Sequence, residues 1–104
     1  MLDKSKTYLI VGLGLLGGKY AQVLSSHGYR VTGIARSRET IDYALQHGYI
    51  AEGAIEDFDA LVTGADCIIF GLYPTVLLDW VKQYGQYIRP GTMVTDVSGV
   101  KRGV

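Results

Sequence analysis

Short apolar runs recur along the chain, and they are typical of strands buried within a sheet. Residues 8–11 are Tyr-Leu-Ile-Val and are followed by a glycine, a pattern typical of a strand covered on both faces. Residues 67–70 form a second clear run of this kind. With two weaker runs and one short candidate, the pattern predicts five strands, over residues 8–11, 30–35, 49–51, 67–70 and 92–97.

Between these runs, apolar residues are spaced three or four positions apart, which is the spacing of one helix face. The pattern predicts helices over residues 14–27, 37–47, 57–62 and 75–88. Asp57 suits the N-cap of the third helix. The side chains expected to face inward are Leu16, Tyr20, Val23 and Leu24 in the first helix, Ile41, Ala44 and Leu45 in the second, and Leu77, Trp80, Val81, Tyr84 and Ile88 in the fourth.

Strands that alternate with helices pair in parallel, because each helix returns the chain across the sheet. Right-handed crossovers then produce a doubly wound α/β sheet of the Rossmann type. The chain has 104 residues, which is the size of one domain and leaves no room for two. We therefore expect a single nucleotide-binding domain over residues 1–104.

A glycine-rich turn joins the first predicted strand to the first helix. Residues 12–17 match G-x-G-x-x-G, and their place inside a strand–helix–strand unit makes the match specific for dinucleotide binding. Gly12 allows the sharp turn, Gly14 lets the backbone approach a pyrophosphate, and Gly17 lets the helix pack on the sheet. The amides of Gly14, Leu15 and Leu16 open the helix, where anions bind. The alternative is a glycine turn used only for packing.

The end of the second predicted strand indicates which dinucleotide is bound. Enzymes that use NAD usually place Asp or Glu there, but that position falls on Ala35 or Arg36, and the next carboxylate is Glu39. Guanidinium groups pair with a 2′-phosphate that a carboxylate would repel. Arg36, Ser37 and Arg38 therefore favour NADP over NAD. The alternative is that Ser37 only caps the helix and the arginines are simply exposed.

Two further loops reach the edge at which a doubly wound sheet binds ligands, beyond the carboxyl ends of its strands. The loop at residues 71–75 should lie along the cofactor, although a plain strand-to-helix turn is the alternative. The loop at residues 96–101 carries a carboxylate, a hydroxyl and an ammonium group where a substrate would meet the nicotinamide. The expected contacts are Leu72, Tyr73 and Pro74 with the cofactor, and Asp96, Ser98 and Lys101 with the substrate.

The two histidines and the cysteine have structural interpretations. His27 and His47 end helices that run back from the ligand edge, so both should lie at the opposite edge and neither should be catalytic. Cys67 lies inside a predicted buried strand, where a small core residue is expected. As the chain's one cysteine, it forms no internal disulfide, which fits a reducing compartment.

Composition excludes several function classes. Apolar residues make up 48% of the chain and charged residues 19%, as in a packed globular domain. Ten basic and ten acidic residues cancel, so no net field attracts nucleic acid or an anionic membrane. No apolar run approaches the ~20 residues of a membrane span, and the start lacks a signal peptide pattern. We expect a cytoplasmic domain with no metal, nucleic acid or membrane partner.

Three stretches resemble the prephenate and arogenate dehydrogenases of tyrosine biosynthesis. Residues 11–18, Val-Gly-Leu-Gly-Leu-Leu-Gly-Gly, are similar to the family's opening G-L-G-L-I-G-G. Residues 65–70 together with Pro74 are similar to its A-D-x-V-x-x-A-x-P segment. Residues 95–101, Thr-Asp-Val-Ser-Gly-Val-Lys, are similar to its T-D-V-G-S-V-K, with serine and glycine exchanged. Many nicotinamide enzymes share the first two motifs, whereas the third is far more specific.

The resemblance implies an oxidative decarboxylation of prephenate or arogenate, in which the substrate's ring carbon gives a hydride to the nicotinamide and carbon dioxide leaves. It also implies that Ser98 helps to orient the substrate hydroxyl and a catalytic histidine. The family's histidine lies in an H-P-M-x-G segment beyond this motif, and neither that segment nor the helical substrate domain occurs in these 104 residues. We therefore expect a cofactor-binding fragment that is inactive alone.

Two other interpretations stay open. The chain could be the cofactor domain of another NADP-linked dehydrogenase or reductase, which the third motif argues against. It could instead be a dinucleotide-sensing module without chemistry. Because the sheet would lack a neighbour beyond its fifth strand, an apolar face would be left uncovered, and we expect limited solubility or self-association.

Overall fold

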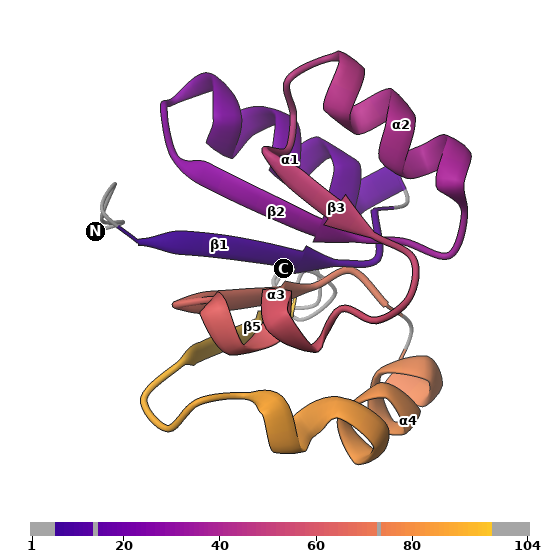
Figure 1. The fold of residues 1–104 in the computed structure, drawn as a ribbon, viewed down its shortest axis with the longest axis vertical. Helices are drawn as coiled ribbons and strands as arrows, with labels where there is room; N and C mark the ends of the chain where they lie inside the picture. Colours follow the sequence, from indigo (N-terminus) through magenta and orange to yellow (C-terminus); the bar gives the residue numbers. More distant parts are fainter. Residues whose placement is uncertain (1–5, 14, 73, 97–104) are drawn as a thin grey trace, which may run out of the picture.

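Five parallel strands join in the order β3-β2-β1-β4-β5 in this computed structural model, which describes residues 6–13, 15–72 and 74–96 (Figure 1). Every adjacent pair is parallel. The order shows that the chain starts in the middle of the sheet and builds outward in both directions, which confirms the predicted doubly wound Rossmann-type fold. The strands are β1 (Thr7–Val11), β2 (Arg30–Ile34), β3 (Glu52–Ala54), β4 (Cys67–Phe70) and β5 (Met93–Asp96).

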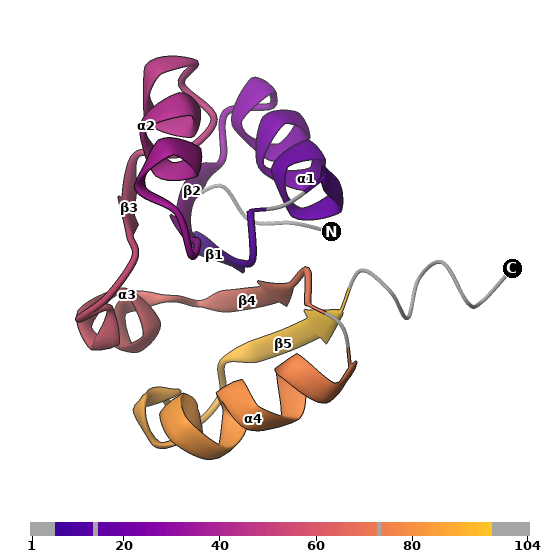
Figure 2. The same cartoon turned by 90° about the vertical axis from the view of Figure 1, so that its right-hand side faces the viewer.

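Helices cover both faces of the sheet (Figure 2). Two of them, α1 (Leu15–Ser26) and α2 (Arg38–Gln46), pack on one face. The other face is covered by α3 (Asp59–Gly64) and α4 (Pro74–Tyr84), and a 3₁₀ helix, η1 (Gly85–Tyr87), follows α4. This two-sided cover explains why the central strands β1 and β4 are apolar along nearly their whole length.

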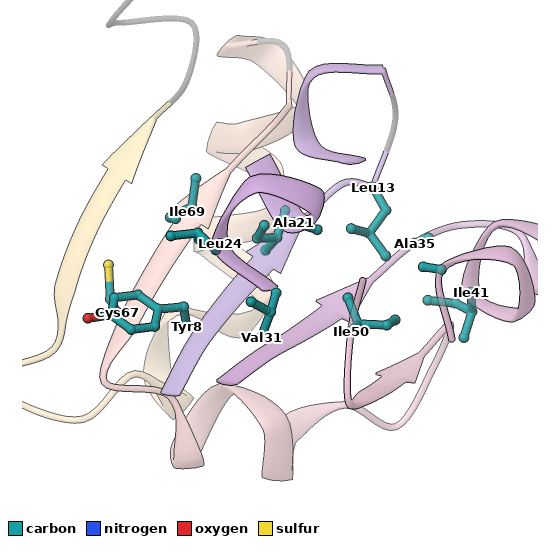
Figure 3. Close-up of a cluster of buried hydrophobic side chains, with 12 residues drawn as sticks. Tyr8, Leu13, Ala21, Leu24, Val31, Ala35, Ile41, Ile50, Cys67 and Ile69 are labelled. Atoms are coloured by element: carbon teal, nitrogen blue, oxygen red, sulfur yellow. The ribbon is translucent and has the colours of Figure 1, made fainter. Parts of the chain in front are cut away.

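Alternate residues of each central strand enter different cores, because successive side chains of a strand point to opposite faces. Tyr8 of β1 (Figure 3) enters the α1/α2 core together with Ile10, whereas Leu9 enters the α3/α4 core. Cys67 of β4 is buried in the α1/α2 core, as predicted, and Ile68 in the other. Each large side chain buried in this way contributes about 1.5–3 kcal/mol to the free energy of unfolding.

The predicted position of the third strand was wrong. Residues 49–51 lead into the strand, and β3 itself is Glu52–Ala54, paired with Thr32–Ile34 of β2. Gly48, at φ +72°, turns the chain after α2, and Tyr49 donates its amide to the carbonyl of Ala44. Tyr49 is therefore still part of the turn that closes α2, and the ladder with β2 begins only after it.

Asp57 does not cap α3, contrary to the prediction. It has φ +52°, and α3 begins two residues later, after Phe58, which has no side-chain capping bond. Phe58 is buried and packs against Trp80 and Tyr84 of α4. Burial of this ring, rather than a polar cap, determines where α3 starts.

Three residues predicted to face the core are exposed: Val23, Leu45 and Val81. Over residues 17–26 of α1, the part whose side chains are described, the buried positions are Gly17, Ala21 and Leu24, four and three residues apart, so Val23 lies on the flank of that stripe. The side chain of Leu16, also predicted to face inward, lies outside that part. The fourth helix also ends at Tyr84 instead of residue 88, because Gly85 opens a 3₁₀ turn. The predicted helical spacing of the apolar residues was correct, but the buried face of each helix is narrower than predicted.

Asp66 directly precedes β4 and hydrogen-bonds to the first residues of β1 and β5, at the edge of the sheet where these strands begin. Its carboxylate accepts from the amide of Thr7 at 2.8 Å and from the Arg89 guanidinium at 3.1 Å. Its own amide donates to the Thr7 carbonyl, and its carbonyl accepts from the amide of Met93. The amide of Thr7 and the charge of Arg89 lower the pKa of Asp66 below its ordinary value of 3.8.

Replacing Asp66 with Asn should therefore remove a pH-dependent part of the stability. A carboxyl group whose pKa is lower in the folded state stabilises the fold above its unfolded pKa, and this is lost as the pH falls through the folded value. We expect Asp66→Asn to lower the free energy of unfolding at pH ~7 and to change it little at pH ~2, measured by urea denaturation. The exposed Asp42→Asn is the control, and an equal loss at both pH values would contradict the assignment.

Candidate functional site

The strand order reverses between β1 and β4, and the ends of the strands are level at that point. In the register of the sheet, Val11 lies opposite both Ile34 and Phe70, and Phe70 lies opposite Asp96. The loops that follow β1, β2, β4 and β5 therefore leave the sheet at one common edge. Open α/β sheets bind ligands in the crevice at such a reversal.

Three glycine backbones meet at this crevice. Gly12 turns the chain at φ +91°, and its amide donates to the carbonyl of Ile34 at 2.8 Å. A Cβ atom at Gly17 would collide with the carbonyl oxygen of Gly12, which is the close packing predicted for this glycine. A Cβ atom at Gly71 would lie only 2.8 Å from that same oxygen. The sequence predicted that the loop containing Gly71 lies along the cofactor, but not the close contact of Gly71 with Gly12, although a glycine directly after a buried strand was a visible signal.

The start of α1 faces the crevice with its first amides free of helical partners. The helix begins at Leu15, and its first turn contains no acidic residue, so no carboxylate competes with a bound anion. Of the predicted pyrophosphate contacts, Gly14 lies outside the described residues, and the backbones of Leu15 and Leu16 belong to this first turn. A glycine turn without side chains and a helix N-terminus without acids fit a pyrophosphate group.

Beside the glycines is an open hollow of about 290 Å³, lined by the loops after β1, β2 and β4 and by the first turns of α2 and α4. This volume is near the lower end of the ~300–1,000 Å³ usual for ligand pockets. Its lining combines apolar side chains with a few polar ones, as nucleoside sites do. The lining residues are Gly12, Leu13, Ala35, Arg36, Ser37, Thr40, Gly71, Leu72 and Val76.

Arg36 and Ser37 come together at this hollow, in the loop between β2 and α2. Ala35 is buried, and Arg36 is exposed. The Ser37 hydroxyl accepts from the amide of Glu39 at 3.2 Å and so caps α2. Arg38, the first residue of α2, is not among the lining residues. Thr40, one helical turn after Ser37, lines the hollow and was missed, because no local motif identifies it.

The other predicted contacts follow β4 and β5. Leu72 lines the hollow, and Pro74 begins α4, whereas Tyr73 lies outside the described residues. Asp96 ends β5 at the same edge of the sheet as Phe70. Ser98 and Lys101 lie outside the described residues, so their relation to Asp96 stays a prediction.

The two histidines lie at the opposite edge, as predicted from the direction of their helices. His27 follows α1 and His47 is the C-cap of α2, with each ring Nδ1 2.9 Å from a carbonyl oxygen of its own helix. Burial raises the pKa of the Cys67 thiol, which favours the inert protonated form. Within residues 6–96, as far as they are described, no three His, Cys, Asp or Glu side chains form a potential metal site.

No helix among the described residues has the length and apolar character needed to cross a bilayer.

The candidate site consists of a glycine turn, a helix N-terminus and a hollow with an arginine and two hydroxyl groups. These features define a dinucleotide-binding domain of the Rossmann type.

The chain belongs to the family described as the NAD binding domain of 6-phosphogluconate dehydrogenase, whose model matches residues 7–102. It is accordingly a nicotinamide dinucleotide-binding domain of a dehydrogenase, within an oxidoreductase family. No curated protein is significantly similar to it.

Solved structures with the same fold include an arogenate dehydrogenase, a prephenate dehydrogenase and a 3-hydroxyisobutyrate dehydrogenase. Arogenate dehydrogenase from Synechocystis superimposes with a TM-score of 0.79 at 24% identity, over 86% of this chain and 32% of that one. Prephenate dehydrogenase from A. aeolicus, in complex with hydroxyphenyl propionate and NAD⁺, gives 0.77 at 26% identity, over 88% and 32%. The 3-hydroxyisobutyrate dehydrogenase of Mycobacterium tuberculosis gives 0.77 at 25% identity, over 88% and 31%.

Together with the family match, these structures confirm the resemblance to the N-terminal nucleotide-binding domain of prephenate and arogenate dehydrogenases. The chain spans about a third of the length of each of these enzymes.

The glycine contacts lead to a stability prediction. Gly17→Ala should lower the free energy of unfolding by about 3 kcal/mol or more. The added Cβ atom would collide with the backbone carbonyl oxygen of Gly12, which cannot move aside as the end of a flexible side chain can. Gly64→Ala is the matched control, since a Cβ atom there meets nothing within 4 Å; its effect should stay within about 1 kcal/mol. Thermal or urea unfolding measures both, and equal effects would contradict the close packing at Gly17.

Proposed function

We propose that the chain is the NADP-binding domain of a prephenate or arogenate dehydrogenase. The observation that carries the proposal is the position of the most specific motif, residues 95–101. The motif begins on the last two residues of β5, and Asp96 lies opposite Phe70. Phe70 directly precedes Gly71, which belongs to the cofactor crevice. A motif at that place can reach both the nicotinamide and a substrate.

The preference for NADP is supported by the loop after β2. The hollow there has Arg36, Ser37 and Thr40 in its wall and no carboxylate. An NAD enzyme usually has an acidic residue at this place to bind the ribose hydroxyls, whereas a guanidinium group pairs with a 2′-phosphate. The A. aeolicus relative was solved with NAD⁺, so the preference for NADP rests on this chain's own residues.

In this proposal the domain's residues bind and orient, and the cofactor supplies the hydride acceptor. The glycine turn and the start of α1 hold the pyrophosphate, Leu72 and Val76 contact the adenosine part, and Arg36 and Ser37 bind the 2′-phosphate, with Arg38 close by. Gly14, Tyr73 and Pro74 complete the cofactor contacts. Asp96, Ser98 and Lys101 lie toward the substrate. In the prephenate and arogenate dehydrogenases that the chain resembles, the catalytic histidine belongs to an H-P-M-x-G segment, and a separate helical domain completes the substrate pocket.

A second candidate is a 3-hydroxyisobutyrate-type dehydrogenase. The observation that favours it is the M. tuberculosis enzyme, whose TM-score and identity are close to those of the A. aeolicus enzyme. The third candidate, a dinucleotide sensor without chemistry, would need the same site but no second domain.

Substrate oxidation separates these candidates. The coding sequence beyond Val104 is read, and the whole encoded protein is incubated with NADP and prephenate, arogenate or 3-hydroxyisobutyrate. Nicotinamide reduction with prephenate or arogenate is expected, together with an in-frame H-P-M-type segment. Reduction with 3-hydroxyisobutyrate alone would favour the second candidate. A stop codon directly after Val104, together with cofactor binding but no reduction, would favour the dinucleotide sensor.

Cofactor choice is tested on the 104-residue chain by calorimetry. Arg36→Ala should weaken NADP binding about 10–100-fold and leave NAD binding nearly unchanged, because a charged hydrogen bond contributes ~1.5–3 kcal/mol. Ser37→Asp keeps an N-cap residue but adds a charge that repels the 2′-phosphate, so it should also select against NADP. Arg30→Ala is the control, since Arg30 pairs with Glu52 at the opposite edge. Unchanged NADP affinity in Arg36→Ala would refute the assignment.

A further inference from the structure

A second open hollow lies between α1 and α2, which run side by side over one face of the sheet (Figure 2). Its volume is about 340 Å³, compared with about 290 Å³ for the cofactor hollow. We call it the α1/α2 groove. Its wall is formed by Leu13 of the glycine turn, by residues of α1 between positions 18 and 22, and by residues of α2 and the turn after it, between positions 40 and 49.

The α1/α2 groove and the cofactor hollow share a boundary. Leu13 and Thr40 line both of them, so the two hollows open beside each other at these residues. Arg36 and Ser37 line only the cofactor hollow, and Lys19 lines only the groove. A guanidinium group and an ammonium group therefore stand beside the same pair of residues, one in each hollow.

The Lys19 side chain is free to move toward this boundary. It is exposed, and none of the ion pairs among the described residues involves it. An added Cβ atom at Gly18 would lie 3.8 Å from the carbonyl oxygen of Leu13, so the glycine keeps this side of the boundary clear of side chains. Lysine carries its charge on a flexible four-carbon stem. The ammonium group can therefore turn toward an anion that is bound at the boundary.

The surroundings of the boundary favour a phosphate group. Neither hollow has an aspartate or glutamate in its lining, and Glu39, next to Thr40 in the sequence, lines neither. A phosphate monoester carries a charge of about −1.5 to −2 at neutral pH, which one guanidinium group neutralises only in part. Two cations with hydroxyl groups between them, and no acid beside them, suit such a group.

We propose that Lys19 is a second cationic contact of the NADP 2′-phosphate and so helps to determine cofactor specificity. This role rests on the proposed function as an NADP-binding domain. The phosphate lies at the boundary formed by Leu13 and Thr40, where Arg36 binds it from the loop after β2 and Lys19 from α1. The glycine motif contacts the pyrophosphate through its backbone, and Lys19, two residues after Gly17, adds a side-chain contact from the same helix.

Calorimetry on the 104-residue chain, with NADP and NAD as the two ligands, tests this role. Lys19→Gln should weaken NADP binding about 3–10-fold and change NAD binding by less than about twofold, because only NADP has a 2′-phosphate. Lys19→Arg keeps the charge and should keep most of the NADP affinity. Lys82→Gln is the matched control, since it removes the same charge from an exposed position on α4, on the other face of the sheet. It should change neither affinity.

A salt series separates a charge contact from a structural effect. Salt screens the pairs between the phosphate and its cations, so the preference of the unsubstituted chain for NADP should decrease as sodium chloride is added. In Lys19→Gln the decrease should be less steep, because one fewer cation faces the phosphate. A variant that only disturbs α1 would keep the original salt dependence. Circular dichroism checks that each variant is folded.

Four results would overturn this role of Lys19. Unchanged NADP affinity in Lys19→Gln, with weakened binding in Arg36→Ala, would refute it and leave the proposed NADP site intact. An equal loss of NADP and NAD affinity would mean that Lys19 acts on a part common to both cofactors. An equal effect of Lys82→Gln would indicate net charge alone. Equal affinity of the unsubstituted chain for NADP and NAD would refute the proposed NADP preference, and the role of Lys19 with it.

Discussion

The close approach of three backbones at Gly12, Gly17 and Gly71 is the constraint on which this structure depends. The carbonyl oxygen of Gly12 occupies the space that a Cβ atom of either other glycine would need. Helix α1 therefore begins directly against β1, and the loop after β4 lies against both. This contact brings the helix N-terminus to the strand reversal, so the packing of the sheet and the shape of the anion site have one cause.

Much of the fold was predictable because its signals are local. The apolar strands, the change to helical spacing and the glycine motif each lie within a few residues, and each reports burial or a backbone requirement at that place. The loop at Arg36 and Ser37 was predictable for the same reason, since it directly follows a strand. Serine serves there as the helix cap, and this leaves the arginine free at the edge of the hollow.

The errors arise where distant residues decide. Residues 49–51 have strand character, but the turn after α2 uses them, and pairing begins at Glu52. Asp57 resembles a cap, but the start of α3 follows the contact of Phe58 with two rings of α4. Thr40 of α2 belongs to the hollow only because the start of that helix meets the loops after β1 and β4 there. No local pattern contains these contacts, since each depends on how the whole sheet is assembled.

Leu13 gives the glycine turn a property that the motif does not state. Its side chain is buried among the residues that pack under α1 and α2, and it fills the space above Gly33 on β2. The turn is thus anchored by a hydrophobic side chain directly beside its tightest bend. A loop held in this way loses little conformational entropy when a ligand arrives, so the domain is preorganised and more of the contact energy appears as affinity.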